Sequence, residues 1–276
     1  MDTPRSWLFV PGDCEGMMQK ALASGADALI LDLEDAVSLE AKPAARASVA
    51  RFLNSARTLP CFVRVNALDT GMTGNDIAAL AVPPDGFVLP KCEGPADLER
   101  LSAMTNNLPI LAIATETVKA VRALFTDDWS HPNLFGMAWG GEDLAADLGA
   151  SANRDALGGY LGPFAMARDA MLFAAKAAGV AAIDAVHTDF RVLTGLTGEA
   201  RSAAAVGFTG KLAIHPAQIA PIHDAFTPTA EMVDWAKQVI AAMEEADGGI
   251  ARLRGQMLDK PHLDRARTIL RRATKH

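Results

Sequence analysis

Eight short apolar segments, separated by amphipathic stretches, are the feature of this sequence that most restricts its fold. Helical periodicity falls between them, as over residues 38–53 and 164–178. Strands that alternate with helices predict repeated βα units and a parallel sheet, whose buried strands are apolar on both faces. The predicted strands cover residues 7–10, 28–33, 61–66, 86–89, 110–115, 134–139, 182–186 and 211–214.

Eight βα units can close a barrel, and barrels of this kind commonly use about 250 residues as one domain. We therefore predict a (β/α)8, or TIM, barrel over residues 1–228 and a C-terminal helical extension carrying a lid element over residues 229–276. A doubly wound open sheet would show the same alternation. However, no GxGxxG follows the first segment and the sequence contains no P-loop.

Charge and composition exclude several classes of partner. The net charge of −7 disfavours nucleic acid, and no apolar stretch approaches the roughly 20 residues of a membrane span. No secretory signal pattern opens the chain, so we expect a cytoplasmic protein. Cys14, Cys61 and Cys92 are widely spaced and form no CxxC pair, so we expect idle thiols, without a disulfide or a zinc site.

Polar side chains follow most of the predicted strands, at the end of a barrel where active sites form. In strand order they are Glu34 and Asp35, Arg64, Lys91, Glu116, Asp143 and His215. Carboxylates from neighbouring strand ends, without a Cys or His pair, suit a hard cation such as Mg²⁺. On pattern alone, helix capping explains Glu116 and Asp143 equally well, because acidic residues favour helix N-termini.

An ordered set of motifs extends over nearly the whole chain. They are RSWLFVPG (5–12), LDLEDAV (31–37), VRVN (63–66), LPK (89–91), ET (116–117), GGEDL (140–144) and IHPAQI (214–219). Together they closely resemble the citrate lyase β-subunit-like family, kin of the malyl-CoA and citramalyl-CoA lyases in the HpcH/HpaI aldolase superfamily. Each motif alone is weak, and their order makes the resemblance specific.

The resemblance implies a (β/α)8 barrel in which Glu116 and Asp143 bind Mg²⁺. It also implies that Arg64 contacts substrate oxygens, although a salt bridge to Glu34 or Asp35 is the structural alternative. Glu34 and Asp35 would then hold Arg64 or a metal-bound water. The implied reaction cleaves a 3-hydroxyacyl-CoA of the citryl, malyl or citramalyl type to an acyl-CoA and an oxoacid.

The implied acid or base for this reaction is Asp259. Residues 255–261, GQMLDKP, resemble a C-terminal element of the family that reaches over the barrel of a neighbouring subunit. The resemblance thus implies a homo-oligomer, a trimer or hexamer, in which Asp259 crosses a subunit interface. Alternatively, Asp259 only balances the basic tail, which has eight Lys or Arg and two Asp from residue 250 onward.

A CoA thioester carries several phosphate charges, so an acidic protein needs local cations to bind it. Arg5, Lys20, Lys42 and Arg46 are the candidates, although Lys42 and Arg46, four residues apart, could equally form ion pairs on a helix face. Lys91 is a Schiff-base candidate that the metal pair disfavours. We interpret His215 as ordering the last βα loop.

Three other functions stay open at this stage. An enolate-stabilising site could hydrolyse the thioester, it could act as an aldolase on free hydroxy-oxoacids, or the chain could be a partner-dependent subunit of a citrate lyase complex.

Overall fold

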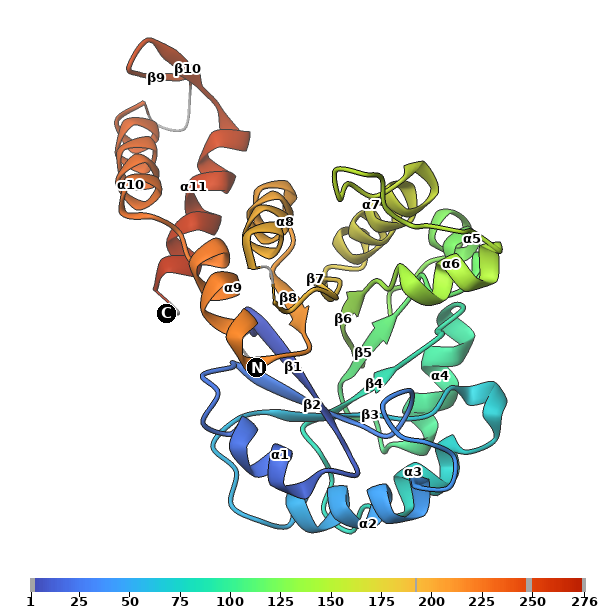
Figure 1. Ribbon diagram of the computed structural model, residues 1–276. Coiled ribbons are helices and arrows are strands. Elements are labelled where there is room, and N and C mark those ends of the chain that lie inside the picture. Colours follow the sequence, from blue (N-terminus) through green and yellow to red (C-terminus); the bar gives the residue numbers. More distant parts are fainter. Residues whose placement is uncertain (1–2, 192, 247–249, 275–276) are drawn as a thin grey trace. The chain divides into compact units, whose positions relative to one another are not determined.

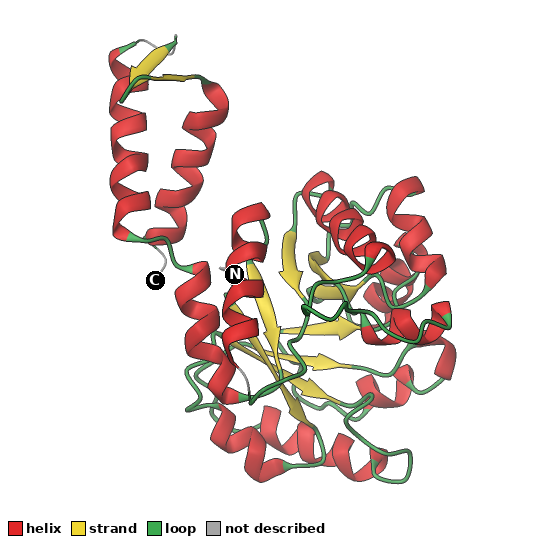
Figure 2. Ribbon diagram, turned by 45° about the horizontal axis from the view of Figure 1, so that its top comes forward, coloured by secondary structure: helices red, strands yellow, loops and turns green. Residues whose placement is uncertain are grey.

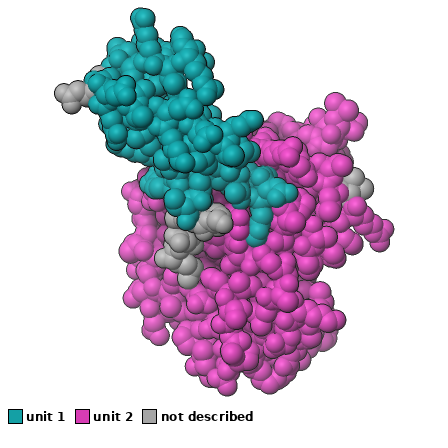
Figure 3. Space-filling view, turned by 90° about the vertical axis from the view of Figure 1, so that its left-hand side faces the viewer, with its two compact units in different colours: residues 1–2, 223–276 teal, residues 3–222 magenta. Residues whose placement is uncertain are grey.

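The computed structural model describes residues 3–191, 193–246 and 250–274. The described chain divides into two compact units, one formed by Thr3–Ile222 and one that starts at His223. Figure 3 colours the two units separately. The predicted domain boundary after residue 228 falls in the loop between helices α9 (Ile219–Phe226) and α10 (Ala230–Glu245).

Eight parallel strands form a closed barrel in chain order, and the last strand pairs with the first (Figure 1). This confirms the predicted (β/α)8 fold. The strands are β1 (Ser6–Pro11), β2 (Ala28–Asp32), β3 (Cys61–Arg64), β4 (Gly86–Leu89), β5 (Ile110–Ile113), β6 (Leu134–Ala138), β7 (Ala181–Asp184) and β8 (Gly210–Ala213).

Helices surround the strands (Figure 2). Several begin with proline in their first turn, as in α2, α4 and α7, where a missing N–H costs no helical hydrogen bond. The described chain has no helix long and apolar enough to cross a membrane. The helices between the strands are α1 (Glu15–Ala21), α2 (Lys42–Leu53), α3 (Thr73–Ala78), α4 (Pro95–Met104), α5 (Val118–Thr126), α6 (Glu142–Leu148), α7 (Gly162–Ala177) and α8 (Leu193–Val206); the 3-10 turns are Leu68–Thr70 and Pro216–Gln218.

Alternate strand residues fill the barrel interior. Ile30 and Phe62 belong to one buried cluster with Trp7, whose ring meets that of Phe62 edge to face at 5.0 Å. Because side chains on a strand alternate between faces, the residues two positions further along, Asp32 and Arg64, also point inward. Asp32 and Arg64 are direct partners in the β2–β3 register. The interior is thus apolar in its middle and charged at its carboxyl end.

Six predicted strands run one or two residues too far at this end. The observed strands β2, β3, β5, β6, β7 and β8 stop at Asp32, Arg64, Ile113, Ala138, Asp184 and Ala213. Beyond these ends, hydrogen bonds to side chains replace part of the ladder. The backbone N–H of Asn66, for example, donates to Asp76 at 2.7 Å. The apolar pattern continues past the last ladder residue, so it overestimates strand length.

The extension has its own hydrophobic core. Val239 and Met243 of α10 pack with Leu258 and Ile269 in one buried cluster. Helix α10 opens the extension and agrees with its predicted helical character. The other elements are strands β9 (Ala251–Leu253) and β10 (Gln256–Leu258), an antiparallel hairpin, and helix α11 (Lys260–Ala273).

Candidate metal and substrate site

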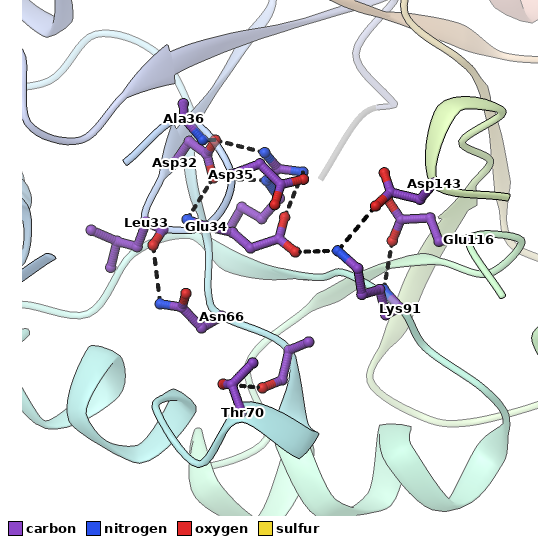
Figure 4. Close-up of polar contacts among 12 residues, drawn as sticks. Asp32, Leu33, Glu34, Asp35, Ala36, Asn66, Thr70, Lys91, Glu116 and Asp143 are labelled. Atoms are coloured by element: carbon purple, nitrogen blue, oxygen red, sulfur yellow. Dashed lines mark hydrogen bonds and ion pairs between the residues drawn. The ribbon is translucent and has the colours of Figure 1, made fainter. Parts of the chain in front are cut away.

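Glu116 and Asp143 lie beside one another at the carboxyl ends of β5 and β6 (Figure 4). Glu116 is only 4% exposed, and Asp143 stands in the first turn of α6. The Thr115 hydroxyl joins the two strand ends, because it accepts a hydrogen bond from the Gly140 N–H at 2.9 Å. Two carboxylates from neighbouring strands are therefore held on one side of the barrel mouth.

Lys91 connects these carboxylates to Glu34 in the loop that follows β2. Its backbone N–H donates to Glu116 Oε2 at 2.6 Å, and its Nζ donates to Glu34 Oε1 at 2.6 Å and lies 3.3 Å from Asp143 Oδ1. Burial opposes the charge, but the hydrogen bond to Glu34 and the surrounding carboxylates raise the pKa of Lys91 above its ordinary value. A Schiff-base lysine must be neutral to react, so this environment argues against that role.

Arg64 is held chiefly by Asp32, a residue that the sequence did not mark as part of the site. Arg64 Nε and Nη2 donate to the two Asp32 oxygens at 2.7 and 2.6 Å. Asp32, 1% exposed, also accepts from the backbone N–H groups of Glu34 and Ala36. The signal in the sequence was its position, two residues beyond Ile30 on the inward face of β2.

The predicted salt bridge between Arg64 and Glu34 is present. Arg64 Nη1 lies 2.8 Å from Glu34 Oε2, at an angle that does not make a hydrogen bond, and 3.9 Å from Asp35 Oδ2. The Arg64 guanidinium also stacks on Phe9, 4.8 Å from the ring centre. Since a guanidinium has five N–H donors, these contacts orient Arg64 and leave donors for a ligand.

The charges of this cluster favour a divalent cation. Among the residues that the structure describes, Asp32, Glu34 and Asp143 form ion pairs with Arg64 and Lys91 alone, and Glu116 accepts a hydrogen bond from the Lys91 backbone N–H. No three His, Cys, Asp or Glu side chains in the described ranges gather as a metal site. The protein would thus supply two carboxylates, which is usual for Mg²⁺, and water or substrate would fill the other positions. The donor set fits the predicted ion.

If Glu116 is a metal ligand, as predicted, we expect metal binding to depend on pH. Burial is the main reason that the pKa of Glu116 is raised to about 8. The negative charges of Asp143 and Glu34 also raise this pKa, whereas the hydrogen bond from the Lys91 backbone N–H lowers it. A proton therefore competes with the metal below this pH. We expect Mg²⁺ affinity to fall roughly tenfold for each pH unit below 8. Calorimetry in buffers of different ionisation enthalpy should show about one proton released at pH 6.5 and almost none at pH 9. Equal affinity at pH 6 and 8 would contradict the assignment.

Gly140 gives Glu116 its space. A Cβ at Gly140 would lie 3.2 Å from Glu116 Cγ and 3.3 Å from Oε1, so the buried carboxylate would have to shift. We expect Gly140→Ala to weaken Mg²⁺ binding by about tenfold, the size of effect produced by disturbing a ligand's support. Gly16→Ala is the matched control, because a Cβ there meets nothing within 4 Å. Equal Mg²⁺ affinities of the two variants in a titration would disprove the packing argument.

The four predicted CoA contacts do not gather at this site, and three of them have partners within the barrel. Arg5 donates to Asp27 at 2.9 and 3.0 Å, and both residues precede their strands, so they lie at the opposite end of the barrel. This position argues against a contact between Arg5 and a CoA ester bound beside Glu116, and the role of Arg5 stays a prediction. Lys20 is exposed on α1, and its contact with CoA stays a prediction.

Lys42 and Arg46 stabilise the loops around the mouth. The buried Lys42 Nζ donates to the backbone carbonyls of Leu33 and Glu34 at 2.9 and 3.0 Å, and Arg46 Nε donates to Asp76 at 2.7 Å. These partners differ from the surface ion pairs considered for this helix face. They also argue against CoA binding, because a ligand phosphate would have to displace buried contacts.

Asp259 and His215 have local partners. Asp259 precedes α11 in the extension, is half exposed and pairs with His262 one turn further along. His215 accepts a hydrogen bond from the Ala217 N–H at 3.1 Å and stacks on Phe190, which agrees with a role in ordering the loop after β8. The cysteines are free thiols, and burial raises the pKa of Cys61 to about 11.

Comparisons with protein families agree with this geometry. Residues 165–276 match the model described as C-C bond lyase of the TIM-barrel fold, which defines the class of enzyme. Residues 5–216 match the HpcH/HpaI aldolase/citrate lyase model. The chain belongs to the HpcH/HpaI aldolase/citrate lyase family and is a carbon–carbon lyase.

Named relatives align over almost the full chain. A citrate lyase subunit beta-like protein of Mycobacterium tuberculosis is 41% identical, covering 97% of this chain and 94% of its own. A (3S)-malyl-CoA thioesterase of Cereibacter sphaeroides is 35% identical over 98% of this chain and 94% of its own. The crystal structure of CitE from M. tuberculosis with magnesium, acetoacetate and coenzyme A has a TM-score of 0.87 at 38% identity, covering 98% of both chains.

Proposed function

We propose that this protein is a Mg²⁺-dependent CoA-ester lyase that cleaves a 3-hydroxyacyl-CoA of the citryl, malyl or citramalyl type to an acyl-CoA and an oxoacid. The observation that carries the proposal is the pairing of Glu116 and Asp143 at the barrel mouth that also holds Arg64. The similar CitE structure, which contains magnesium, acetoacetate and coenzyme A, supports this choice of ion and substrate class.

The roles of the residues follow from their charges. Glu116 and Asp143 would hold Mg²⁺, which when bound lowers the pKa of a coordinated hydroxyl and neutralises the oxoacid end. Arg64, fixed by Asp32, donates to substrate oxygens on which charge changes during the reaction. Lys91 orients Glu116 through its backbone N–H, and Glu34 holds Lys91 and Arg64 in place.

The reaction needs one further proton transfer. The hydroxyl loses its proton to solvent, the carbon–carbon bond breaks to give the oxoacid, and the electron pair of that bond moves into the thioester enolate. The enolate carbon then takes a proton, and we assign its donor as Asp259 of a second subunit. This role requires a homo-oligomer, and we propose a trimer or hexamer in which Asp259 crosses a subunit interface.

Asp259→Asn tests that assignment. We expect turnover to fall by about 10²- to 10⁴-fold, the usual contribution of a general acid or base, while Mg²⁺ affinity stays unchanged. Calorimetry measures the affinity and oxoacid formation measures the turnover. Asp264→Asn on the same helix is the control and should keep its activity. Wild-type turnover in the Asp259 variant would remove this residue from the mechanism.

Thioester hydrolysis is the second candidate, favoured by the 35% identical relative that is named a malyl-CoA thioesterase. An assay of the purified protein with Mg²⁺ and a panel of 3-hydroxyacyl-CoA esters separates the two by following free thiol and oxoacid independently. Oxoacid without thiol identifies the lyase, and thiol without oxoacid identifies the thioesterase. Inactivity on every ester would favour a free-acid aldolase or a subunit that depends on a lyase complex.

A further inference from the structure

A second charged cluster lies outside the barrel interior. Ile183 and Leu212 belong to the interior cluster, so their neighbours Asp184 and Lys211 face the surrounding helices. The Lys211 Nζ donates to Asp184 Oδ2 at 2.7 Å, and both residues are almost completely buried. None of the roles assigned to the barrel mouth uses this pair.

A cavity of about 310 Å³ adjoins this cluster within the unit Thr3–Ile222. Its walls come from α7, α8 and the loop that follows α6, and include Gly158, Gly159 and Gly198. A cavity of this size is at the lower limit of small-molecule sites, which run from roughly 300 to 1,000 Å³. The polar side chains in its wall are Arg154, Tyr160, Arg168, Asp184, Glu199 and Ser202.

Arg168 is the group in this wall that has donors to spare. Its Nε donates to Asp184 Oδ1 at 3.1 Å, and its guanidinium stacks on Phe208 at 4.6 Å. Within the described part of the chain, neither terminal nitrogen makes a hydrogen bond, and the carboxylate near Nη1, that of Asp169, is 3.8 Å away. The side chain is only 15% exposed. A fixed guanidinium with free terminal N–H groups is suited to bind a carboxylate through two parallel bonds.

The other cation of the wall, Arg154, is already engaged. It donates to Glu199, to the Gly158 carbonyl and to the Tyr160 hydroxyl oxygen. Burial raises the pKa of Tyr160, so its hydroxyl stays protonated. No described residue accepts that proton in a hydrogen bond, which leaves it available to a ligand.

The charges set the valence of the ligand. Arg154, Arg168 and Lys211 supply three positive charges, and Asp184, Glu199 and the more exposed Asp169, 3.8 Å from Arg168, supply three negative ones. These charges balance, so the wall suits an anion of no more than a single charge. A multiply charged phosphate would meet these carboxylates at close range.

We propose that this cavity binds a small monocarboxylic acid, with its carboxylate on the terminal nitrogens of Arg168 and its remaining polar group within reach of Tyr160 and Ser202. The site is separate from the metal site, and the proposal does not depend on the lyase function.

Calorimetry of the full-length protein with acetate, pyruvate and inorganic phosphate, in EDTA to remove metal-dependent binding, tests the proposal. We expect acetate or pyruvate to bind at least tenfold more tightly than phosphate. Gly198→Leu should weaken that binding at least tenfold by filling the cavity. Its Cβ meets nothing within 4 Å, and leucine is a better helix former than glycine, so the fold should be kept.

Ala205→Leu, at an exposed position of the same helix outside the cavity wall, is the matched control and should bind like the wild type. Arg168→Gln should lose binding as Gly198→Leu does. The proposal is overturned if neither monocarboxylate binds, if phosphate binds as tightly, or if Gly198→Leu binds as well as Ala205→Leu. None of these results bears on the proposed lyase function, because the lyase assay measures products that form only with Mg²⁺.

Discussion

Glu116→Gln is expected to abolish measurable Mg²⁺ binding and to lower turnover by at least about a thousandfold, because a lost metal ion removes several kcal/mol of charge stabilisation. Glutamine keeps the size of the side chain and an oxygen that can accept the Lys91 N–H. The anionic ligand is therefore the main loss. Calorimetry with Mg²⁺ and the oxoacid assay measure the two effects.

The same substitution should not unfold the protein. Burial raises the pKa of Glu116 to about 8, so above that pH the metal-free wild type must keep a buried carboxylate ionised. A raised acid pKa makes folding less favourable as pH rises, and the glutamine variant avoids this cost. In EDTA at pH 9 we expect the variant to melt at a higher temperature than the wild type.

Glu142→Gln is the matched control, since Glu142 adjoins Asp143 but is exposed and pairs with Asn153. It should bind Mg²⁺ and turn over like the wild type. Full Mg²⁺ affinity in the Glu116 variant would show that the ion binds elsewhere.

Arg64→Lys should lower kcat/KM by about 10²- to 10³-fold, the effect of losing one preorganised donor, while Mg²⁺ affinity changes little. Lysine keeps the positive charge but lacks the planar guanidinium. The guanidinium binds both oxygens of Asp32 and has further N–H donors for a ligand. Steady-state kinetics and calorimetry on the same preparation measure the two quantities.

Arg57→Lys is the control for the substitution itself, because Arg57 pairs with Asp85 at the amino end of the barrel. Its kinetics should be those of the wild type. If Arg64→Lys also left kcat/KM unchanged, Arg64 would have only the structural role that its contacts with Asp32 and Glu34 describe.

The barrel could be predicted because each strand carries the same signal. Ile30 and Phe62 face the interior and their neighbours face the apolar sides of the helices, so most strands appear as short apolar runs. The hairpin β9–β10 gave no such signal. Its turn places Arg254 and Gly255 at positive φ, 49° and 82°, and arginine is not a residue from which this conformation is expected.

The sequence offered candidate residues for the site but no signal for their pairings. Motifs located Glu116, Asp143 and Arg64, but the bidentate contact of Arg64 with Asp32 depends on the register of β2 and β3, which no local pattern specifies. The end of the barrel at which Arg5 lies was also predictable. Arg5 precedes β1, and strand direction alone places such a residue at the amino end of the barrel.

The separate core of the extension bears on how this protein can change over evolution. Val239 and Ile269 belong to a cluster whose members all come from the extension, so a substitution at one of them is compensated most directly within that cluster. Substitutions in this segment should therefore depend on one another, and Asp259 can be kept while the helices beside it diverge. Across homologues we expect correlated changes of side-chain volume within this cluster, while the barrel interior varies independently.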